Sequence, residues 1–394
     1  MSPAPRRRVT LVIHLPFRWV AFEWLARDLD RRRFEPSVVL ISPEPHPAKA
    51  TFEALGVDTT TLTYRASNHL RHTLFRLPSL VWRLSKILRR LRPDVVHSHF
   101  GHAPLAVAVA GRWAAPSARI LHTRHVAGPH PWPPRGLQTR IFTRLQQRLS
   151  HRVVAISALV EQALLDDGVP QAKIRNIPHG FDLAAFRDVE PRRIVALRRR
   201  YDLPAEGGPV VGVVARFVEL KGIHHTLAAF ERLLATHPTA VLVLAGTFGA
   251  HQDWLHGLVD RLPSERVRRI HFEEDLFALY RLFDVFVHVP IAPHVEAFGQ
   301  VYVEALAAGV PSIFTRSGIA HELAEDGSNC WLVEHGDVDG IAQGLRNLLD
   351  RPRLRERLVE GGLETAQNYG LETMIGRHAA LYSESDDKRP AALR

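Results

Sequence analysis

The sequence predicts an α/β protein made of two doubly wound, parallel-sheet domains. Short runs rich in Val, Ile and Leu alternate with amphipathic helical patterns along most of the chain, which is typical of parallel strands covered by helices on both faces. The chain has 394 residues, more than a single hydrophobic core usually serves. A polar, arginine-rich and then turn-rich segment, 181–209, interrupts the alternation and indicates where one domain gives way to the next.

Ten apolar runs are expected as strands. They are 9–15, 37–41, 95–98, 120–123 and 153–156 in the first half, and 210–215, 240–245, 270–272, 285–288 and 312–315 in the second. A further apolar strand is expected after the glycine turn that follows Glu322. The predicted division is 1–182, 183–370 and 371–394, the last being a helix and a solvated tail.

Composition excludes several classes of protein. The single cysteine, Cys330, excludes an intramolecular disulfide and a cysteine-rich zinc site, and it fits a reducing cytoplasm. No run of 18 apolar residues occurs, so no membrane-spanning helix is expected. The basic and then apolar start is expected to be a first strand, because its apolar run stops at Pro16 without a signal-peptide cleavage site. The first glycine is Gly56, so the first strand cannot be followed by the G-x-G-x-x-G motif of dinucleotide-binding oxidoreductases.

Positive charge is concentrated in the first half. Residues 1–180 contain 27 lysines and arginines against 11 acidic residues, whereas the remainder contains 24 against 30. This asymmetry indicates an anionic partner for the first domain. Within it, "LPSLVWRLSKILRRLRPD" predicts a basic amphipathic helix with Arg83, Lys86, Arg89 and Arg90 largely off its apolar face. Two interpretations stay open, a core-covering helix with a solvated outer face and a contact with an anionic membrane surface.

Two glutamates eight residues apart form the first candidate site. The segment "EAFGQVYVEALAAG" begins at Glu296 and predicts a loop followed by a helix that ends before Gly309. Gly299 at the helix start would let an anion approach free backbone N–H groups. Glu304, about one and a half turns into the helix, can accept two hydrogen bonds from a vicinal diol. Taken alone, the pair is better explained as a coincidence of two glutamates on a solvated helix, since glutamate is common.

Two cations form the second candidate site. In "VVGVVARFVELKG", Arg216 directly follows a predicted strand and Lys221 precedes a predicted helix. Two cations there can clamp a diphosphate and stabilise it as a leaving group while its charge grows. The alternative is a solvated loop with ordinary positive charges.

In this order, the motifs resemble the retaining, GT-B-fold family 4 glycosyltransferases, the glycosyl transferases group 1 proteins. The family's E-x₇-E element is matched by Glu296 and Glu304, and is followed by "EALAAGVP". Its R-x₄-K clamp is matched by Arg216 and Lys221. "PHGFDLAAF" is similar to its P-N-G-V-D segment with His179 in place of Asn, and "RPDVVHSHF" and "LHTRHV" are similar to its two histidine elements.

The resemblance implies two facing domains, with the acceptor in the first, the nucleotide-sugar donor in the second and the last helix packed back on the first. It implies that Glu304 holds the ribose diol, Arg216 and Lys221 the diphosphate, and Glu296 a sugar hydroxyl. Catalytic residues are then Arg216, Lys221, Glu296 and His125, and donor-binding residues are Glu304, Phe298, Gly299, Gln300, Val301, Arg216 and Lys221. Expected acceptor contacts are His99, His125, Trp132 and Arg18.

No cofactor and no metal ion are expected, with the nucleotide sugar as co-substrate, UDP-linked first and GDP-linked second. His97 and His99 share a strand face as metal ligands can, but strand-end positioning is favoured because no suitable third ligand lies nearby. The expected partners are the donor, a saccharide or lipid-linked acceptor in cell-envelope polysaccharide or glycolipid synthesis, and an anionic membrane surface, with no nucleic acid. The expected location is cytoplasmic, or peripheral on the inner face of the cell membrane.

Two segments depart from the family pattern. The usual glycine turn after the first strand is replaced by the aromatic loop "HLPFRWVAFEW", residues 14–24, and the G-G-x-x-E element appears as "SGIAHE", residues 317–322. Two alternatives to the transferase remain, a sugar-nucleotide 2-epimerase and a catalytically silent nucleotide-sugar-binding protein at a membrane.

Overall fold

A computed structural model of the chain describes residues 5–15, 19–65, 70–100, 103–127, 144–203 and 208–384. The chain divides into two compact units. The first comprises Met1–Ile156, Val160–Gly180 and Glu372–Arg394, and the second comprises Ser157–Leu159 and Phe181–Leu371. The boundaries predicted after residues 182 and 370 fall close to the two ends of Phe181–Leu371.

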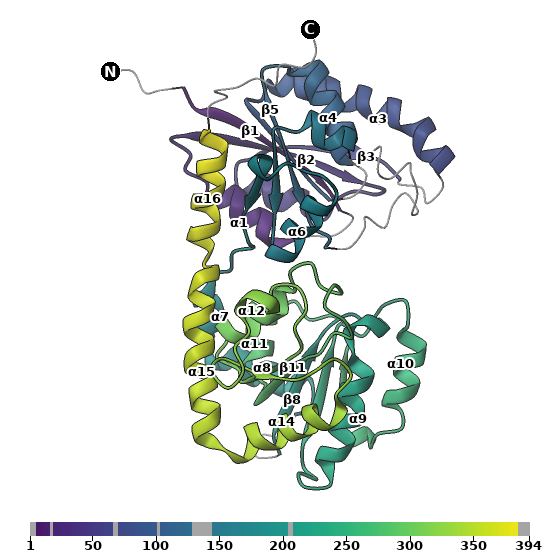
Figure 1. Ribbon diagram of the computed structural model, residues 1–394, viewed down its shortest axis with the longest axis vertical. Helices are drawn as coiled ribbons and strands as arrows, with labels where there is room; N and C mark the ends of the chain where they lie inside the picture. Colours follow the sequence, from purple (N-terminus) through teal and green to yellow (C-terminus); the bar gives the residue numbers. More distant parts are fainter. Residues whose placement is uncertain are drawn as a thin grey trace. The chain divides into compact units, whose positions relative to one another are not determined.

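The first unit is built on a seven-stranded parallel sheet in the order β3-β2-β1-β4-β5-β6-β7 (Figure 1). Its strands are β1 Arg7–His14, β2 Phe34–Ser42, β3 Asp58–Thr63, β4 Val95–His99, β5 Arg119–Arg124, β6 Arg152–Ala155 and β7 Ile174–Asn176. Its helices are α1 Val20–Asp28, α2 Lys49–Ala54, α3 Leu70–Leu91, α4 Ala103–Ala114, α6 Ala158–Asp166 and α16 Leu371–Ser383. The strand order reverses between β1 and β4, and ligands of doubly wound sheets bind at the carboxyl ends beside such a reversal.

The second unit is built on a six-stranded parallel sheet in the order β10-β9-β8-β11-β12-β13 (Figure 1). Its strands are β8 Val210–Val214, β9 Val241–Ala245, β10 Val267–Ile270, β11 Val285–His288, β12 Ser312–Phe314 and β13 Trp331–Leu332. Its helices are α7 Leu183–Arg187, α8 Pro191–Arg200, α9 Ile223–Leu234, α10 Gln252–Val259, α11 Leu276–Tyr280, α12 Gln300–Ala307, α13 Ala320–Leu323, α14 Val338–Asp350 and α15 Pro352–Ala366. The order reverses between β8 and β11.

The predicted fold class is confirmed, with local corrections. The ten strands expected from the sequence do not include β3 and β7. The strand expected at 270–272 is instead Val267–Ile270, because the chain turns outward after it and leaves Phe272 68% exposed. The segment 181–209, predicted as the break between the domains, contains helices α7 and α8. Within the described residues, no helix is long and apolar enough to cross a lipid bilayer.

Helices α3 and α4 cover one face of the first sheet. Leu80, Leu84 and Leu88 of α3 are fully buried against strand residues such as Val39 and Ile120, so the predicted apolar face of α3 is a core face. Successive residues of a strand point to opposite faces, so the β4 histidines at positions 97 and 99 face away from α3. On that opposite face the Tyr382 hydroxyl of α16 is 2.8 Å from His97 Nδ1.

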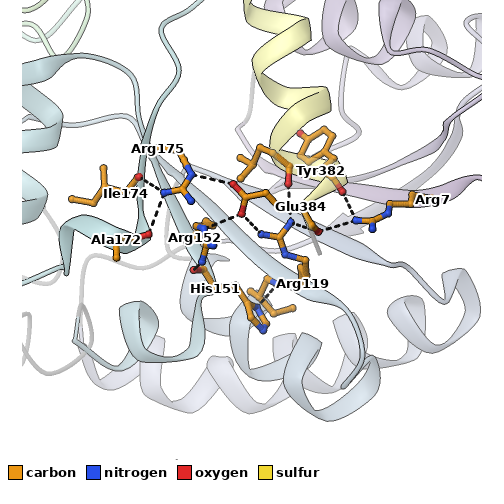
Figure 2. A network of polar contacts seen from close by, with 11 residues as sticks. Arg7, Arg119, His151, Arg152, Ala172, Ile174, Arg175, Tyr382 and Glu384 are labelled. Carbon is orange, nitrogen blue, oxygen red and sulfur yellow. Dashed lines mark hydrogen bonds and ion pairs between the residues drawn. The ribbon is translucent and has the colours of Figure 1, made fainter. Parts of the chain in front are cut away.

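The end of α16 is fixed by arginines from the amino ends of the strands (Figure 2). Arg119 Nη2 and Arg152 Nε lie 2.8 and 3.0 Å from Glu384 Oε2, and Arg175 Nε lies 3.0 Å from Oε1. Arg7 and Arg119 also donate to backbone carbonyls at the end of the helix. Cations there stabilise the negative end of the helix dipole, and one carboxylate offsets part of the charge of three guanidinium groups.

We predict that Glu384→Gln lowers the free energy of unfolding of the chain by about 1–2 kcal/mol at neutral pH, because three arginines lose their anion. Burial would raise the pKa of Glu384, but the Arg175 hydrogen bond and the nearby arginines lower it overall. Its stabilisation is therefore present above the ordinary pKa of 4.5 and is lost as the pH falls through the lower folded-state pKa. Urea denaturation at several pH values measures the difference.

The matched control is Asp339→Asn, which makes the same change at a side chain that is 90% exposed and paired only with Arg232 among the described residues. Its effect should stay within about 0.5 kcal/mol. Equal effects of the two substitutions, or a Glu384→Gln effect that persists in acid, would contradict the assigned role of the Glu384 carboxylate.

Candidate functional site

Glu296 is the centre of a polar cluster in the second unit. It lies in the loop before α12, where Lys221 Nζ forms an ion pair with Glu296 Oε1 and His288 Nε2 lies 2.9 Å from the same oxygen. The backbone N–H of Glu296 donates to Ser317 Oγ over 3.0 Å. The cluster therefore joins the carboxyl end of β11, the 3₁₀ turn Glu219–Lys221 after β8, and the loop after β12.

The environment keeps the Glu296 carboxylate charged. Burial would raise the pKa of Glu296, but the hydrogen bond from His288 and the charge of Lys221 outweigh it and lower the pKa to about 2. Burial lowers the pKa of His288 despite its carboxylate partner, so the ring is a neutral donor through Nε2. Both donors meet Oε1. Oε2 has no hydrogen-bond partner among the described residues and can accept a hydrogen bond from a ligand hydroxyl.

Two glycines allow the loops around Glu296 to approach so closely. Gly299 has a φ of 83°, and a Cβ there would lie 2.6 Å from the Tyr302 ring and 3.2 Å from Glu296 Cγ. Gly318 has a φ of 58°, and a Cβ there would lie 2.5 Å from the Phe298 carbonyl oxygen and 2.6 Å from Glu296 Cβ. A side chain at position 299 would displace the Tyr302 ring, and one at position 318 would displace the Phe298 backbone and the Glu296 side chain.

The predicted helix begins at Gln300, just after Gly299, and its first N–H groups can bind an anion. The first turn of any helix leaves its N–H groups without intrahelical acceptors, and the helix dipole places positive charge there. Gln300 and Val301 occupy these positions. The Phe298 side chain is buried, with its ring near Phe181, so its expected contact with the donor is restricted to backbone atoms.

Glu304 lies deeper in α12 in a different environment. Tyr280, at the end of α11, donates from its hydroxyl to Glu304 Oε2 over 2.7 Å. Burial raises the pKa of Glu304 to about 7, against the lowering effect of this hydrogen bond. Glu304 thus changes charge near neutral pH. Its Oε1 atom has no hydrogen-bond partner within the residues that the structure describes, and can contact a ligand. The tyrosine also orients the carboxyl group, which leaves one fixed acceptor position for a diol.

The two predicted cations differ in their surroundings. Lys221 is paired with Glu296, whereas Arg216 is exposed and has no ion-pair partner among the described residues. The sequence analysis predicted that both cations bind a diphosphate, and it did not predict the Lys221–Glu296 ion pair. Within the part of the chain that the structure describes, no three His, Cys, Asp or Glu side chains are placed to hold a metal ion.

In the first unit, the predicted histidines meet at the carboxyl ends of β4 and β5. His99 Nδ1 is 3.4 Å from His125 Nε2, and His125 is stacked on Phe100 with ring centroids 3.6 Å apart. Phe100 has a φ of 59°, a strained conformation for an aromatic residue of the kind that occurs at functional sites. His97, by contrast, is bonded through both ring nitrogens to Tyr382 and Thr123, so it is a structural residue.

His99 and His125 line a cavity of about 20 Å³, which has room for a water molecule but not for a sugar. Burial, followed by the proximity of other histidines, lowers the pKa of His99 and His125 well below 6.5, so both are neutral. His99 Nε2 and His125 Nδ1 are buried without a hydrogen-bond partner among the described residues. The aromatic loop contributes Trp19 to this cavity, while Arg18 and Trp132 lie outside the described residues.

Sequence reasoning missed the residues that hold the site in place. The sequence identifies His288 only as the last residue of the expected strand 285–288, and Tyr280 belongs to none of the motifs. Both act through contacts that depend on the folded sheet. A position at the carboxyl end of a strand beside the reversal of strand order was the available signal for His288.

Comparison with known proteins agrees with this architecture. A family model described as "Glycosyl transferases group 1" matches residues 198–365, and one described as "Glycosyltransferase Family 4" matches residues 22–185. Glycogen synthase from Mycobacterium tuberculosis is 32% identical over 306 residues, which cover 75% of this chain and 69% of that protein. The lipopolysaccharide core biosynthesis glycosyltransferase LpsE from Rhizobium meliloti is 37% identical over 175 residues, 44% of this chain and 49% of that protein.

Among solved structures, Anabaena Alr3699/HepE in complex with UDP and glucose superposes with a TM-score of 0.79 at 22% identity, over 96% of this chain and 100% of that one. This likeness shows the fold. Together with the family matches and the relative that spans most of both chains, it leads to one conclusion: the chain belongs to the glycosyl transferases group 1 family and is a GT-B glycosyltransferase.

Proposed function

We propose that the protein is a retaining glycosyltransferase that moves a sugar from a nucleotide-sugar donor to a saccharide or lipid-linked acceptor. The observation that carries the proposal is the cluster of Lys221, Glu296 and His288 at the start of α12. It places a cation, an ionised carboxylate and free helix N–H groups together, which are the groups that a sugar joined to a diphosphate requires.

In the proposed mechanism, the donor lies along the start of α12. The diphosphate binds the first N–H groups of the helix and the ammonium group of Lys221, with exposed Arg216 as a second cation. Glu296 accepts a hydrogen bond from a sugar hydroxyl, and Glu304 accepts one from the ribose diol. The acceptor hydroxyl attacks on the leaving-group face, and a donor phosphate oxygen takes its proton. The protein then contributes mainly by stabilising the charge on the departing diphosphate.

The donor we propose first is a UDP-sugar, and second a GDP-sugar. HepE, which shares the fold, was solved with UDP and glucose, but that likeness shows the fold alone. The proposed acceptor is an anionic, lipid-linked saccharide of cell-envelope polysaccharide or glycolipid synthesis. LpsE, which matches part of the chain, has a name that includes lipopolysaccharide core biosynthesis. A cytoplasmic enzyme at the inner membrane face, without cofactor or metal, fits this proposal.

A sugar-nucleotide 2-epimerase is the second candidate function. A solved structure described as a putative UDP-N-acetylglucosamine 2-epimerase from Listeria monocytogenes shares the fold, with a TM-score of 0.65 at 14% identity. An epimerase acts on the donor alone, so nucleotide release that requires an added acceptor excludes it. Slow hydrolysis of the donor in the absence of acceptor would likewise exclude a purely binding role.

We predict that Lys221→Ala lowers kcat by about 10²–10³-fold and weakens donor binding by less than about 10-fold, because the lysine acts mainly on charge that develops during transfer. Steady-state kinetics and calorimetric titration with the donor measure the two effects. Lys49→Ala, which removes an exposed lysine paired with Glu53, is the control and should change neither. Equal losses in kcat and donor affinity would contradict the role of Lys221.

The raised pKa of Glu304 predicts that donor binding strengthens as the pH rises through about 7, since the ionised carboxylate is the stronger acceptor for a diol hydroxyl. Calorimetry in buffers of different ionisation enthalpy should detect a proton released on binding below that pH. Tyr280→Phe removes the hydrogen bond that opposes the shift and should move the midpoint upward. Glu304→Gln should bind weakly at every pH.

The same carboxyl group affects stability with a defined sign. Because its folded-state pKa is raised from 4.5, its contribution is fully present below about pH 4.5 and is lost as the pH rises through about 7. Glu304→Gln should therefore unfold at higher denaturant concentration than the wild type at pH 8, while the exposed control Glu334→Gln should not. A loss of stability in Glu304→Gln at pH 8 would contradict a charge that is costly to bury.

A further inference from the structure

The outer face of α3 carries an exposed stripe of aromatic and cationic side chains. Phe75, Trp82, Lys86 and Arg89 recur at intervals of three, four or seven residues, which places them on one side of the helix. Phe75 is 91% exposed and Trp82 is 51% exposed. Trp113 of α4, 56% exposed, extends the stripe. These five residues are the aromatic–cationic stripe.

Two cations of the stripe are stacked on its tryptophans. Lys86 Nζ lies 3.6 Å from the centroid of the Trp82 ring, and Arg89 Cζ lies 4.6 Å from that of Trp113. Each pair presents an indole and a positive charge at the same point of the surface. Neither cation has a salt-bridge partner among the described residues.

The other two cations that the sequence placed off the apolar face have structural partners. Arg83 donates to the Thr63 carbonyl over 2.8 Å, and Arg90 donates to Thr60 Oγ1 over 2.6 Å and lies 3.5 Å from Asp58. Thr60 and Thr63 belong to β3, the edge strand of the sheet. These two arginines cover the edge of the sheet and so have a structural role. Lys86 and Arg89 of the same helix remain available to a partner.

The surroundings of the stripe select an anionic partner. The sequences of α3 and α4 together contain seven lysines and arginines and no acidic residue. Exposed tryptophan and phenylalanine beside cations suit the boundary between lipid headgroups and acyl chains, where an indole is half in an apolar phase and half in water. The apolar face of α3 is used by the core, so only the stripe can enter that boundary.

We propose that the aromatic–cationic stripe is the surface by which the protein docks on an anionic lipid bilayer. Phe75, Trp82 and Trp113 enter the headgroup boundary, while Lys86 and Arg89 contact lipid phosphates. Contact is peripheral and reversible, because three aromatic side chains and two cations anchor far more weakly than a membrane-spanning helix. The inference deepens the proposed function and rests on it in one respect, since it provides a route to a lipid-linked acceptor.

Co-sedimentation of the full chain with vesicles of phosphatidylglycerol and phosphatidylcholine, against phosphatidylcholine alone, tests the proposal. Each cation near an anionic surface contributes about 1 kcal/mol, so Lys86→Ala with Arg89→Ala should weaken binding about 30-fold. Arg83→Ala with Arg90→Ala removes the same charge from the same helix and should weaken it much less. Binding should fall steeply between 0.1 and 1 M salt, as the Debye length falls from about 10 to 3 Å.

The tryptophans provide a second measurement. Trp82→Ala with Trp113→Ala should weaken binding and remove most of the fluorescence quenching by brominated lipids, whereas Trp254→Ala, at an exposed site in the second unit, should do neither. Circular dichroism melts establish that each variant is folded. Donor binding should be unchanged in all of them, so a failure of docking and a failure of the proposed transferase function are distinguished.

Three outcomes would overturn the proposal. The first is that the wild type does not bind anionic vesicles at low salt. The second is that the Lys86/Arg89 and Arg83/Arg90 double variants lose vesicle binding equally. The third is that an RNA oligonucleotide binds through the same residues and displaces the vesicles. The second would indicate diffuse charge attraction, and the third a nucleic-acid surface.

Discussion

The ionised carboxylate of Glu296, whose side chain is only 12% exposed, is the constraint on which the rest of the second unit's site depends. A carboxylate in a medium of low polarity stays ionised only if several donors replace its water. Lys221 and His288 supply two of them, from the turn after β8 and from the end of β11. The site geometry follows, because both elements must end at the same edge of the sheet. Adjacent pairing of β8 and β11 in a parallel sheet meets that requirement.

Glu296 and Glu304 show how partners, rather than residue type, determine chemical character. Both side chains are partly buried, yet Glu296 has a pKa of about 2 and Glu304 a pKa of about 7. The difference is that Glu296 meets a cation, while the partner of Glu304 in the described part of the chain is the neutral hydroxyl of Tyr280. The first is a permanent anion that can orient a hydroxyl and balance a lysine. The second can exchange a proton as a ligand binds.

Sequence patterns predict the structural elements that are encoded by residues close together in the chain. Buried central strands such as β11 are continuous apolar runs, and their limits could be predicted to within a few residues. The edge strand β3, "DTTTLT", has no such run because it is half exposed, and it is recognised only by its pairing with β2. In the site, Gly299 and Lys221 belong to spaced motifs. His288 and Tyr280 gain their roles from residues brought close by the sheet, which no local pattern records.

The packing of the first unit depends on α16, which lies at the other end of the sequence. Arg119 is almost fully buried, and its two terminal nitrogens donate to the Glu384 carboxylate and to carbonyls at the end of α16. Tyr382 fills the space beside His97. These partners follow the whole of Phe181–Leu371 in the chain. A buried guanidinium without acceptors is costly, so the final packing of the first sheet requires closure of a loop that contains the second unit. The first unit can therefore complete its packing only after α16 has been synthesised.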